Sequence, residues 1–234
     1  MKFFSATSAT ILALTTIVTA QTTNGLSAAE VEGRALAQKL LEQWPAENST
    51  NHGLVKIKHR DDISIVFETL VTETNWISRY QTGASWLTII RSGTNANQYH
   101  FHAENGKETD LSGSETMQPF AGSDFWVTDL GLEFFHWPGQ KVLPNPTTLK
   151  LGRSYTLLES TSPFTNGYSR VLTWIDRESY GILEAEAYDV KGELLKEFYP
   201  KNFKKVNGLY QVESMDMINH QTDSRTRLEF DLKK

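Results

Sequence analysis

Two histidines are the residues whose type and spacing best suit the binding of a metal ion. His100 and His102 stand two apart in a segment that alternates like a β-strand, so both side chains project from one face of that strand. A zinc site needs a third and usually a fourth ligand, and no fixed spacing in the sequence supplies them. A secreted metallo-hydrolase built on these histidines therefore stays an alternative, and the sequence predicts a polar outer face with no bound metal.

Other catalytic patterns are absent or incomplete. Glu133 and His136 form one Glu-x-x-His motif, but di-iron bundles need that motif twice. There is no Gly-x-Ser-x-Gly elbow, no phosphate-binding loop or dinucleotide fingerprint, and no cysteine. A net charge of −5 is atypical of nucleic-acid binders. The sequence thus predicts a protein that is not an enzyme, has no catalytic residue and no cofactor, and binds no nucleic acid.

The first twenty residues have the features of a secretory signal peptide. Lys2 gives a positive start, residues 11–18 are mostly apolar, and Val18-Thr19-Ala20 fits a small-x-small cleavage site. The apolar part is shorter than the roughly 20 residues of a membrane span, and no later segment is long and apolar enough to cross a bilayer. We predict cleavage near Ala20, a location outside the cytoplasm, and a single domain over residues 21–234.

The elements of this domain follow from the hydrophobic period. Ser27 and Glu30 predict a capping box at the start of one helix, which Pro45 ends. The period then changes to two, which predicts about ten or eleven antiparallel strands. Because closure removes exposed edges, we expect one strongly curved sheet or a barrel. The expected strands cover residues 63–71, 76–80, 86–90, 99–103, 154–160, 168–176, 182–189, 194–198, 209–219 and 226–232.

One segment interrupts the β pattern. Ser123 can cap a helix over residues 124–135, in which Asp129, Glu133 and His136 are the polar stripe on an otherwise apolar surface. A helix that is apolar on most sides is usually buried on most sides, so we expect it inside or across the mouth of the curved sheet. The pattern fits a static core plug and a movable lid equally well.

The aromatic content of 11% requires a large core or an apolar pocket. Alternate apolar residues of each strand should share the inner face of the sheet. On the helix, one apolar side should face the cavity, while Phe125, Leu132 and Phe135 hold the helix to the rim. The predicted ligand-binding residues of the cavity and lid are Ile65, Phe67, Trp76, Trp86, Ile90, Phe101, Trp126, Leu130, Phe134 and Phe230.

A series of short motifs resembles the bacterial outer membrane lipoprotein-sorting protein family, in its LolA-like branch. The motifs are residues 76–80, 97–99, 119–125, 168–171, 174–176, 187–189, 196–198 and 225–230, within a likeness over roughly residues 54–230. The resemblance implies that residues 21–234 form a mainly β domain, a half-open antiparallel β-barrel with helices covering a hydrophobic cavity.

The resemblance also implies a function, that of a soluble periplasmic carrier that binds lipoprotein acyl chains or a related lipid and helps sort it to the outer membrane. Its partners would then be an inner-membrane transporter and an outer-membrane acceptor. A binding module for another apolar ligand, or a partner in an envelope complex, is the alternative.

Overall fold

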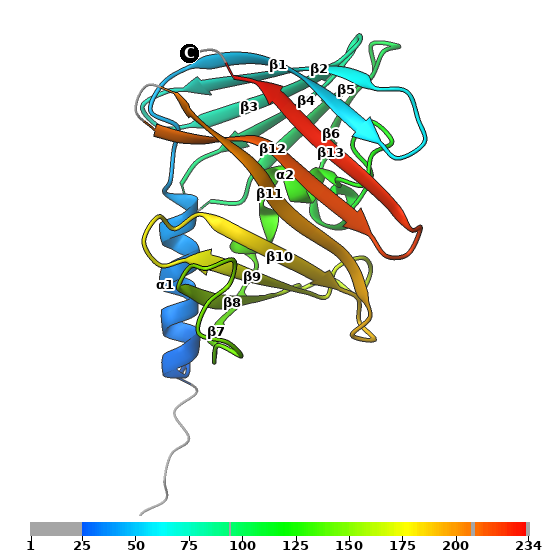
Figure 1. The fold of residues 1–234 in the computed structure, drawn as a ribbon. Coiled ribbons are helices and arrows are strands. Elements are labelled where there is room, and N and C mark those ends of the chain that lie inside the picture. The colour runs from blue at the N-terminus through cyan, green and yellow to red at the C-terminus, as the bar shows by residue number, and fades with distance from the viewer. Residues whose placement is uncertain (1–24, 94, 207–208, 233–234) are drawn as a thin grey trace, which may run out of the picture.

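The computed structural model describes residues 25–93, 95–206 and 209–232. The predicted signal peptide, residues 1–20, lies outside them. The described chain forms one 13-stranded antiparallel sheet, in the order β6-β5-β4-β3-β2-β1-β13-β12-β11-β10-β9-β8-β7 (Figure 1). The two halves of the chain each form a meander, and they join where β1 pairs with β13. Because the end strands β6 and β7 do not pair with each other, the strongly curved sheet is a half-open barrel.

The strands of the first half are β1 (Ser49–Ile57), β2 (Ile63–Val71), β3 (Trp76–Thr82), β4 (Ser85–Arg91), β5 (Gln98–His102) and β6 (Glu108–Leu111). Those of the second half are β7 (Gly139–Leu143), β8 (Tyr155–Thr161), β9 (Arg170–Asp176), β10 (Ile182–Tyr188), β11 (Leu194–Val206), β12 (Leu209–Asn219) and β13 (Ser224–Asp231). The helices are α1 (Ala28–Leu41), α2 (Val127–Gly131) and the short 3-10 turns η1 (Gly113–Thr116) and η2 (Glu133–His136).

The half-open antiparallel barrel predicted from the sequence is confirmed, with a different strand count. The strands that the period did not identify are β1, β6 and β7. Gly53 lies in the middle of β1 because β13 approaches closely there: a Cβ would lie 2.0 Å from the carbonyl oxygen of Glu229. β6 is a short, charged strand at one end of the sheet, and β7 begins directly after Pro138. None of these segments shows the apolar alternation by which strands are identified.

Helix α1 covers the other end of the sheet. The predicted capping box is present, with the backbone N–H of Ser27 donating to Oε2 of Glu30 at 2.7 Å. Gly33 lets α1 approach β7 closely, since a Cβ there would lie 2.5 Å from the backbone nitrogen of Lys141. None of the helices in the described ranges has the length and apolarity needed to cross a membrane.

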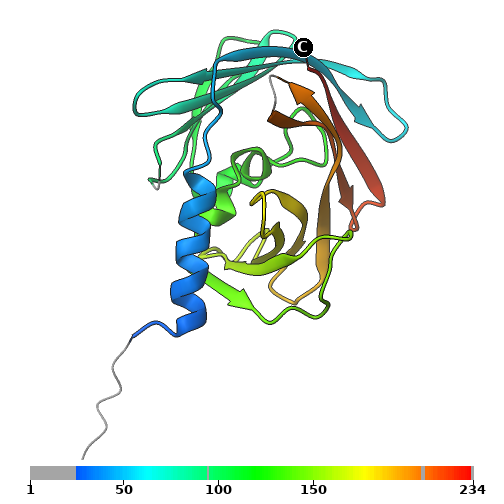
Figure 2. The same cartoon turned by 60° about the vertical axis from the view of Figure 1, so that its left-hand side comes forward.

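Residues 118–137, which we call the inner segment, run through the inside of the half-barrel (Figure 2). The segment begins with a tight turn, in which the N–H of Phe120 donates to the carbonyl oxygen of Phe125 at 2.8 Å. It continues through α2 and η2 and ends at β7. Side chains of the segment belong to both large apolar clusters of the protein. The inner segment is therefore the centre of the core.

The single helix predicted for residues 124–135 is wrong. Helix α2 has five residues and ends at Gly131. Its C-cap, Leu132, has a left-handed φ of 51°, and η2 follows as a separate 3-10 turn. Gly131 permits Tyr99 to approach the chain closely at this break, because a Cβ there would lie 2.0 Å from the hydroxyl oxygen of Tyr99. The contacts with the sheet thus override the helical period of the sequence.

Candidate binding site inside the half-barrel

The inner segment fills most of the space that the sheet encloses. Between the segment and the wall formed by β9–β12 remains a cavity of about 30 Å³. Its lining includes Leu132, Phe134 and Asp129 from the segment, and Val171, Ala185 and Lys196 from the wall. Ligand pockets usually measure about 300–1,000 Å³. A lipid would therefore fit only if the inner segment gave way.

Most of the strand residues predicted to face the interior do so. Pairing places Ile65, Phe67, Trp76, Phe101 and Phe230 on the inner face, together with fully buried Leu87 and Leu228. The ring of Phe67 lies 4.8 Å from that of Tyr80 and 5.3 Å from that of Phe230, measured between centroids. These side chains form an apolar inner wall, and their contact with a ligand stays a prediction.

Trp86 and Ile90 are not on this wall, so their placement in the cavity is wrong. In β4 the inner positions are Leu87, Ile89 and Arg91, since Leu87 pairs with the inner residue Tyr80. Trp86 instead stacks on the imidazole of His102 on the outer face, with a centroid separation of 3.6 Å. Both faces of β4 carry apolar residues, and the inner one also carries an arginine, so alternation alone selected the wrong face.

The predicted lid residues lie inside the protein. Leu130 and Phe134 are buried, and Trp126 stacks on the ring of Tyr168 at 4.5 Å. Phe125 packs edge-to-face against Phe198 of β11. Among the residues expected at the rim, Leu132 instead lines the small cavity. Leu132 does not lie at the rim, because the helix breaks at this residue.

Arg91 fixes one side of the inner segment, although no motif in the sequence points to it. Its guanidinium donates to the carbonyl oxygen of Leu130 at 2.7 Å and to Oγ of Ser78 at 2.8 Å. It also lies 4.3 Å above the ring of Trp76. Burial lowers the pKa of Arg91, although nearby tyrosines and Glu133 oppose this effect. A buried arginine bonded to a helix carbonyl ties α2 to the sheet.

A second group of contacts holds the same side. The amide Nδ2 of Asn97 donates to the carbonyl oxygen of Gly131 and to Oε2 of Glu133, both at 2.9 Å. The hydroxyl of Tyr99 donates to the same carboxylate at 2.7 Å. Burial raises the pKa of Glu133, against the effect of these hydrogen bonds. Glu133 therefore anchors the inner segment to β5 and the loop before it.

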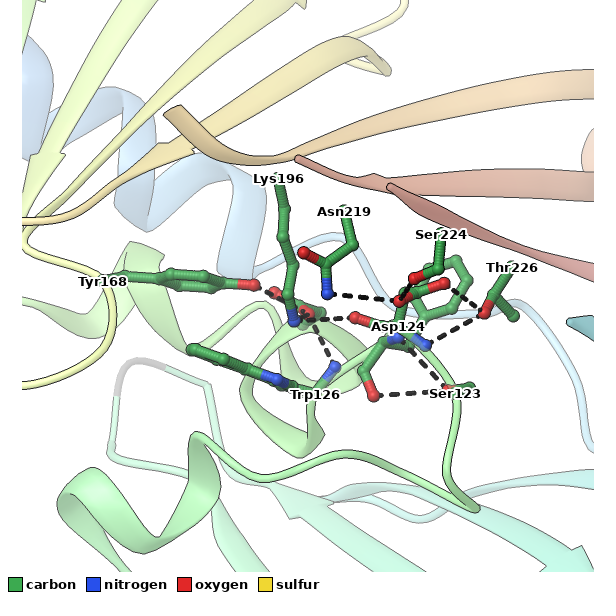
Figure 3. A network of polar contacts seen from close by, with 10 residues as sticks. Ser123, Asp124, Trp126, Tyr168, Lys196, Asn219, Ser224 and Thr226 are labelled. Carbon is green, nitrogen blue, oxygen red and sulfur yellow. Dashed lines mark hydrogen bonds and ion pairs between the residues drawn. The ribbon is translucent and has the colours of Figure 1, made fainter. Parts of the chain in front are cut away.

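A polar network holds the other side of the segment, at the wall formed by β11, β12 and β13 (Figure 3). The carboxylate of Asp124 accepts hydrogen bonds from Nδ2 of Asn219 at 3.2 Å, from Oγ1 of Thr226 at 2.8 Å, and from the hydroxyl of Ser224. Thr226 is itself the acceptor for the backbone N–H of Asp124, at 2.9 Å. Asp124 thus binds the sheet, and the helix cap predicted at Ser123 is wrong, because α2 begins at Val127 with Trp126 as its N-cap.

Lys196 completes this network from β11, and it too was not identified from the sequence. Its side chain is 1% exposed, and Nζ donates to the carbonyl oxygen of Asp124 at 2.7 Å. Nζ also lies 3.6 Å from the centroid of the Trp126 ring and 3.9 Å from Oδ2 of Asp129. Burial lowers the pKa of Lys196 to about 8, although Asp129 and Asp124 oppose the shift.

Asp129 connects Lys196 to the start of α2. Its Oδ2 accepts the backbone N–H of Trp126 at 2.7 Å and the hydroxyl of Tyr168 at 3.1 Å. Burial raises the pKa of Asp129, with Lys196 as the main opposing influence. The lysine and the carboxylate are therefore both shifted toward their neutral forms.

The histidine pair lies on the outer face, and each histidine has its own acidic partner. His100 contacts Asp110 at 2.6 Å, and His102 contacts Glu108 at 3.4 Å, each across the β5–β6 pair. Within the described residues, the group close enough to share an ion is acidic: Glu184, Glu186 and Glu197. Each already has a partner, Lys150, Tyr188 and His220 respectively.

The architecture defines a class of protein: a half-open barrel whose interior is filled by one short, polar-anchored segment. Solved structures with a similar overall fold include the following three. A domain from Vibrio parahaemolyticus assigned as an outer membrane lipoprotein-sorting protein superposes with a TM-score of 0.73 at 22% identity, covering 87% of this chain and 92% of that one. A DUF1329 family protein from Desulfovibrio piger gives 0.69 at 17% identity, with coverages of 88% and 92%. A LolA superfamily protein from Nitrosomonas europaea gives 0.59 at 16% identity, with coverages of 88% and 93%.

These similarities confirm the predicted resemblance at the level of the fold, which is LolA-like. A family model described only as "Uncharacterized protein" matches residues 78–233, more than half of the chain, and the chain belongs to that family. The search of curated proteins found no match.

Proposed function

We propose that this protein is a periplasmic carrier that holds lipoprotein acyl chains, or a related lipid, inside the half-barrel and helps to sort them to the outer membrane. Secretion would follow from cleavage of residues 1–20, and an inner-membrane transporter and an outer-membrane acceptor would be the partners. The similar fold of a domain assigned to lipoprotein sorting supports this proposal.

The observation that carries the proposal is the way in which the inner segment is held. Most of its side chains are apolar, but its attachments to the sheet are polar. Three of them use its backbone carbonyls: Arg91 binds Leu130, Asn97 binds Gly131, and Lys196 binds Asp124. Buried charges of this kind often stabilise a fold less than apolar residues of similar volume would. A segment that only filled the core would therefore be stabilised more by apolar packing than by these buried charges.

The same attachments suit an element that moves. Helix α2 has only five residues, and so short a helix depends on tertiary contacts for its stability. When the segment leaves, it exposes the apolar inner wall formed by residues such as Phe67, Phe101 and Phe230. Each acyl CH₂ that this wall shields from water contributes about 0.8 kcal/mol. Ligand contacts can therefore replace the contacts of the segment with little change in free energy.

Extraction of the purified protein tests the proposal directly. The protein is expressed with its own residues 1–20 in a bacterial host, purified without detergent, and extracted with organic solvent for mass spectrometry. We expect the extract to contain acylated lipid in a molar amount comparable to that of the protein. We also expect the protein to bind added hexadecanol after its own lipid has been removed. An extract free of acyl lipid, together with no binding of hexadecanol, would contradict the proposal. Recovery of a non-acyl apolar compound would favour a binding module for another ligand.

A further inference from the structure

Four donor side chains of the sheet converge on one residue of the inner segment. Thr226, Ser224 and Asn219 donate to the carboxylate of Asp124, and Lys196 donates to its backbone carbonyl oxygen. The donors come from β11, β12 and β13 and approach Asp124 from the wall, as Figure 3 shows. Thr226 and Lys196 are almost completely buried. The donors of β11, β12 and β13 are therefore already arranged to bind an anion in a place that water hardly reaches.

The positive and negative partners belong to different parts of the fold. Lys196 is on the wall, whereas Asp124 and Asp129, the carboxylates that act on it, both belong to the inner segment. The Trp126 ring beneath its ammonium group moves with that segment too. If the segment leaves, the ammonium group of Lys196 retains no hydrogen bond to any residue that the structure describes, and only the ring of Tyr168, 5.5 Å away, stays near it.

Arg91 differs in this respect. Its bond to Ser78 and its contact with Trp76 are both made within β3 and β4, so they persist when the inner segment moves. An ammonium group without a partner in an apolar cavity is unfavourable. Lys196 is thus the inner cation that most needs a new counter-ion in the open state.

We propose that Lys196, Asn219, Ser224 and Thr226 form an anion cradle that takes the negatively charged head of an acyl-chain amphiphile, and that Asp124 occupies this cradle when no ligand is bound. The head is a carboxylate or a phosphate, since both accept several charge-assisted hydrogen bonds. The chain would lie along the adjoining apolar wall of Val171, Ala185, Phe198 and Met217. This inference rests on the proposed function, because the ligand must replace the inner segment.

Three ligands with the same chain test the cradle: hexadecanol, palmitate and hexadecyl phosphate, each titrated below its aggregation concentration at pH 7. We expect the wild-type protein to bind at least one of the two anionic ligands about tenfold or more tightly than hexadecanol, as a charge-assisted bond allows. In Lys196→Met this preference, measured as the ratio of the two affinities within the variant, should fall to within about threefold. Lys56→Met, which removes a charge that pairs with Glu229 on the outer face of β1, is the matched control and should keep the preference.

The outcomes separate the two proposals. If none of the three ligands binds, the proposed function itself is wrong. If hexadecanol binds as tightly as both anions, or if the preference survives in Lys196→Met, the protein carries acyl chains but the cradle is wrong. Acetate and inorganic phosphate should not displace hexadecyl phosphate at equal concentration; displacement would show a site for small free anions and overturn the amphiphile assignment.

A second variant covers the case in which Lys196→Met does not fold, as judged by circular dichroism. Thr226→Val keeps the side-chain shape and removes one donor to Asp124. We expect it to fold and to lower the preference for the anionic ligands by about threefold or more. An unchanged preference in folded Thr226→Val would overturn the cradle in that case.

Discussion

Lys196 and Arg91 are two cations inside an apolar half-barrel, and each holds a backbone carbonyl of the inner segment. Burial opposes the charge on both. The free energy that they lose by desolvation is recovered only while the carbonyl, the aromatic ring and the nearby carboxylate are in place. At the scale of single residues, both cations are therefore stabilised by their contacts with the inner segment.

The pH dependence of stability tests the state of Lys196. The groups that face it are Asp129, Asp124, Tyr168 and the ring of Trp126. With a pKa of about 8 in the folded protein and an ordinary value of 10.5, the folded state releases this proton between pH 8 and 10.5 while the unfolded state keeps it. The contribution of Lys196 to stability therefore rises with pH across this window.

Urea unfolding of the wild type and Lys196→Met at pH 7.5, 8.5 and 9.5 measures this contribution. The free energy of unfolding of the wild type, relative to the variant, should increase with pH and approach a gain of about 3 kcal/mol at the alkaline limit. The comparison cancels the tyrosines that titrate in both proteins. Parallel profiles would show that Lys196 keeps its ordinary pKa.

The inner and outer faces of the sheet give a matched pair of binding variants. Phe67 lies on the inner wall, between Tyr80 and Phe230, and Trp86 lies on the outer face. Phe67→Ala should weaken hexadecanol binding about tenfold, because an apolar side chain is lost from the wall. Trp86→Ala should leave it unchanged. Isothermal titration of both variants is the measurement, and equal losses would contradict the assignment of faces.

The side chains of the site differ in how far the sequence could predict them. Period-two alternation correctly placed Phe67, Trp76 and Phe230, because their strands have one clearly apolar face. It could not place Arg91 or Lys196, since a charged residue in an alternating strand normally faces solvent. Their position depends on partners that are 39 and 72 residues away along the chain. No local pattern contains that information.

At the scale of elements, the inner segment has a sequence suited to a helix and a structure set by its surroundings. Its apolar residues fit a helical period, which is why one helix over residues 124–135 was predicted. The carboxylate of Asp124 is bound by the sheet, and the hydroxyl of Tyr99 lies against Gly131. Such contacts decide the conformation of a short segment, because its intrinsic helical stability is marginal.

A substitution at Gly131 should weaken the packing of α2 against β5. A Cβ at this position would overlap the hydroxyl of Tyr99 at 2.0 Å, so Gly131→Ala should dislodge α2 from β5. We expect a stability loss of about 1–3 kcal/mol and faster amide hydrogen exchange in residues 118–137. Gly181→Ala, whose Cβ would meet its nearest neighbour, Ser179 Oγ, at 3.3 Å, is the control. Unchanged exchange in Gly131→Ala would show that the inner segment tolerates this change without moving.

At the scale of the whole molecule, the sheet consists of two meanders joined at the β1–β13 pair. The end strands β6 and β7 leave the barrel half open, and α1 packs against β7. The overall class could be predicted from the sequence, because many alternating strands need a curved sheet to limit exposed edges. The closure of β1 on β13 could not, since it joins segments at opposite ends of the chain and has no turn signal between them.

Cleavage of residues 1–20 is a prediction about the whole chain and has a simple test. Residues 1–20 have the composition of a signal peptide, so protein secreted by a bacterial host should begin at Gln21. Intact-mass spectrometry of the purified protein measures this. A mass that includes Met1 to Ala20 would contradict the predicted cleavage.

Movement of the inner segment when lipid binds is the central claim, and hydrogen exchange measures it most directly. Amide exchange is followed by mass spectrometry in the delipidated protein and in the same protein with hexadecanol bound, with occupancy verified by native mass spectrometry. We predict faster exchange in residues 118–137 on binding, while the paired strands β8–β12 keep their protection. Bound hexadecanol with unchanged or slower exchange in residues 118–137 would contradict the account, because the ligand would then lie elsewhere.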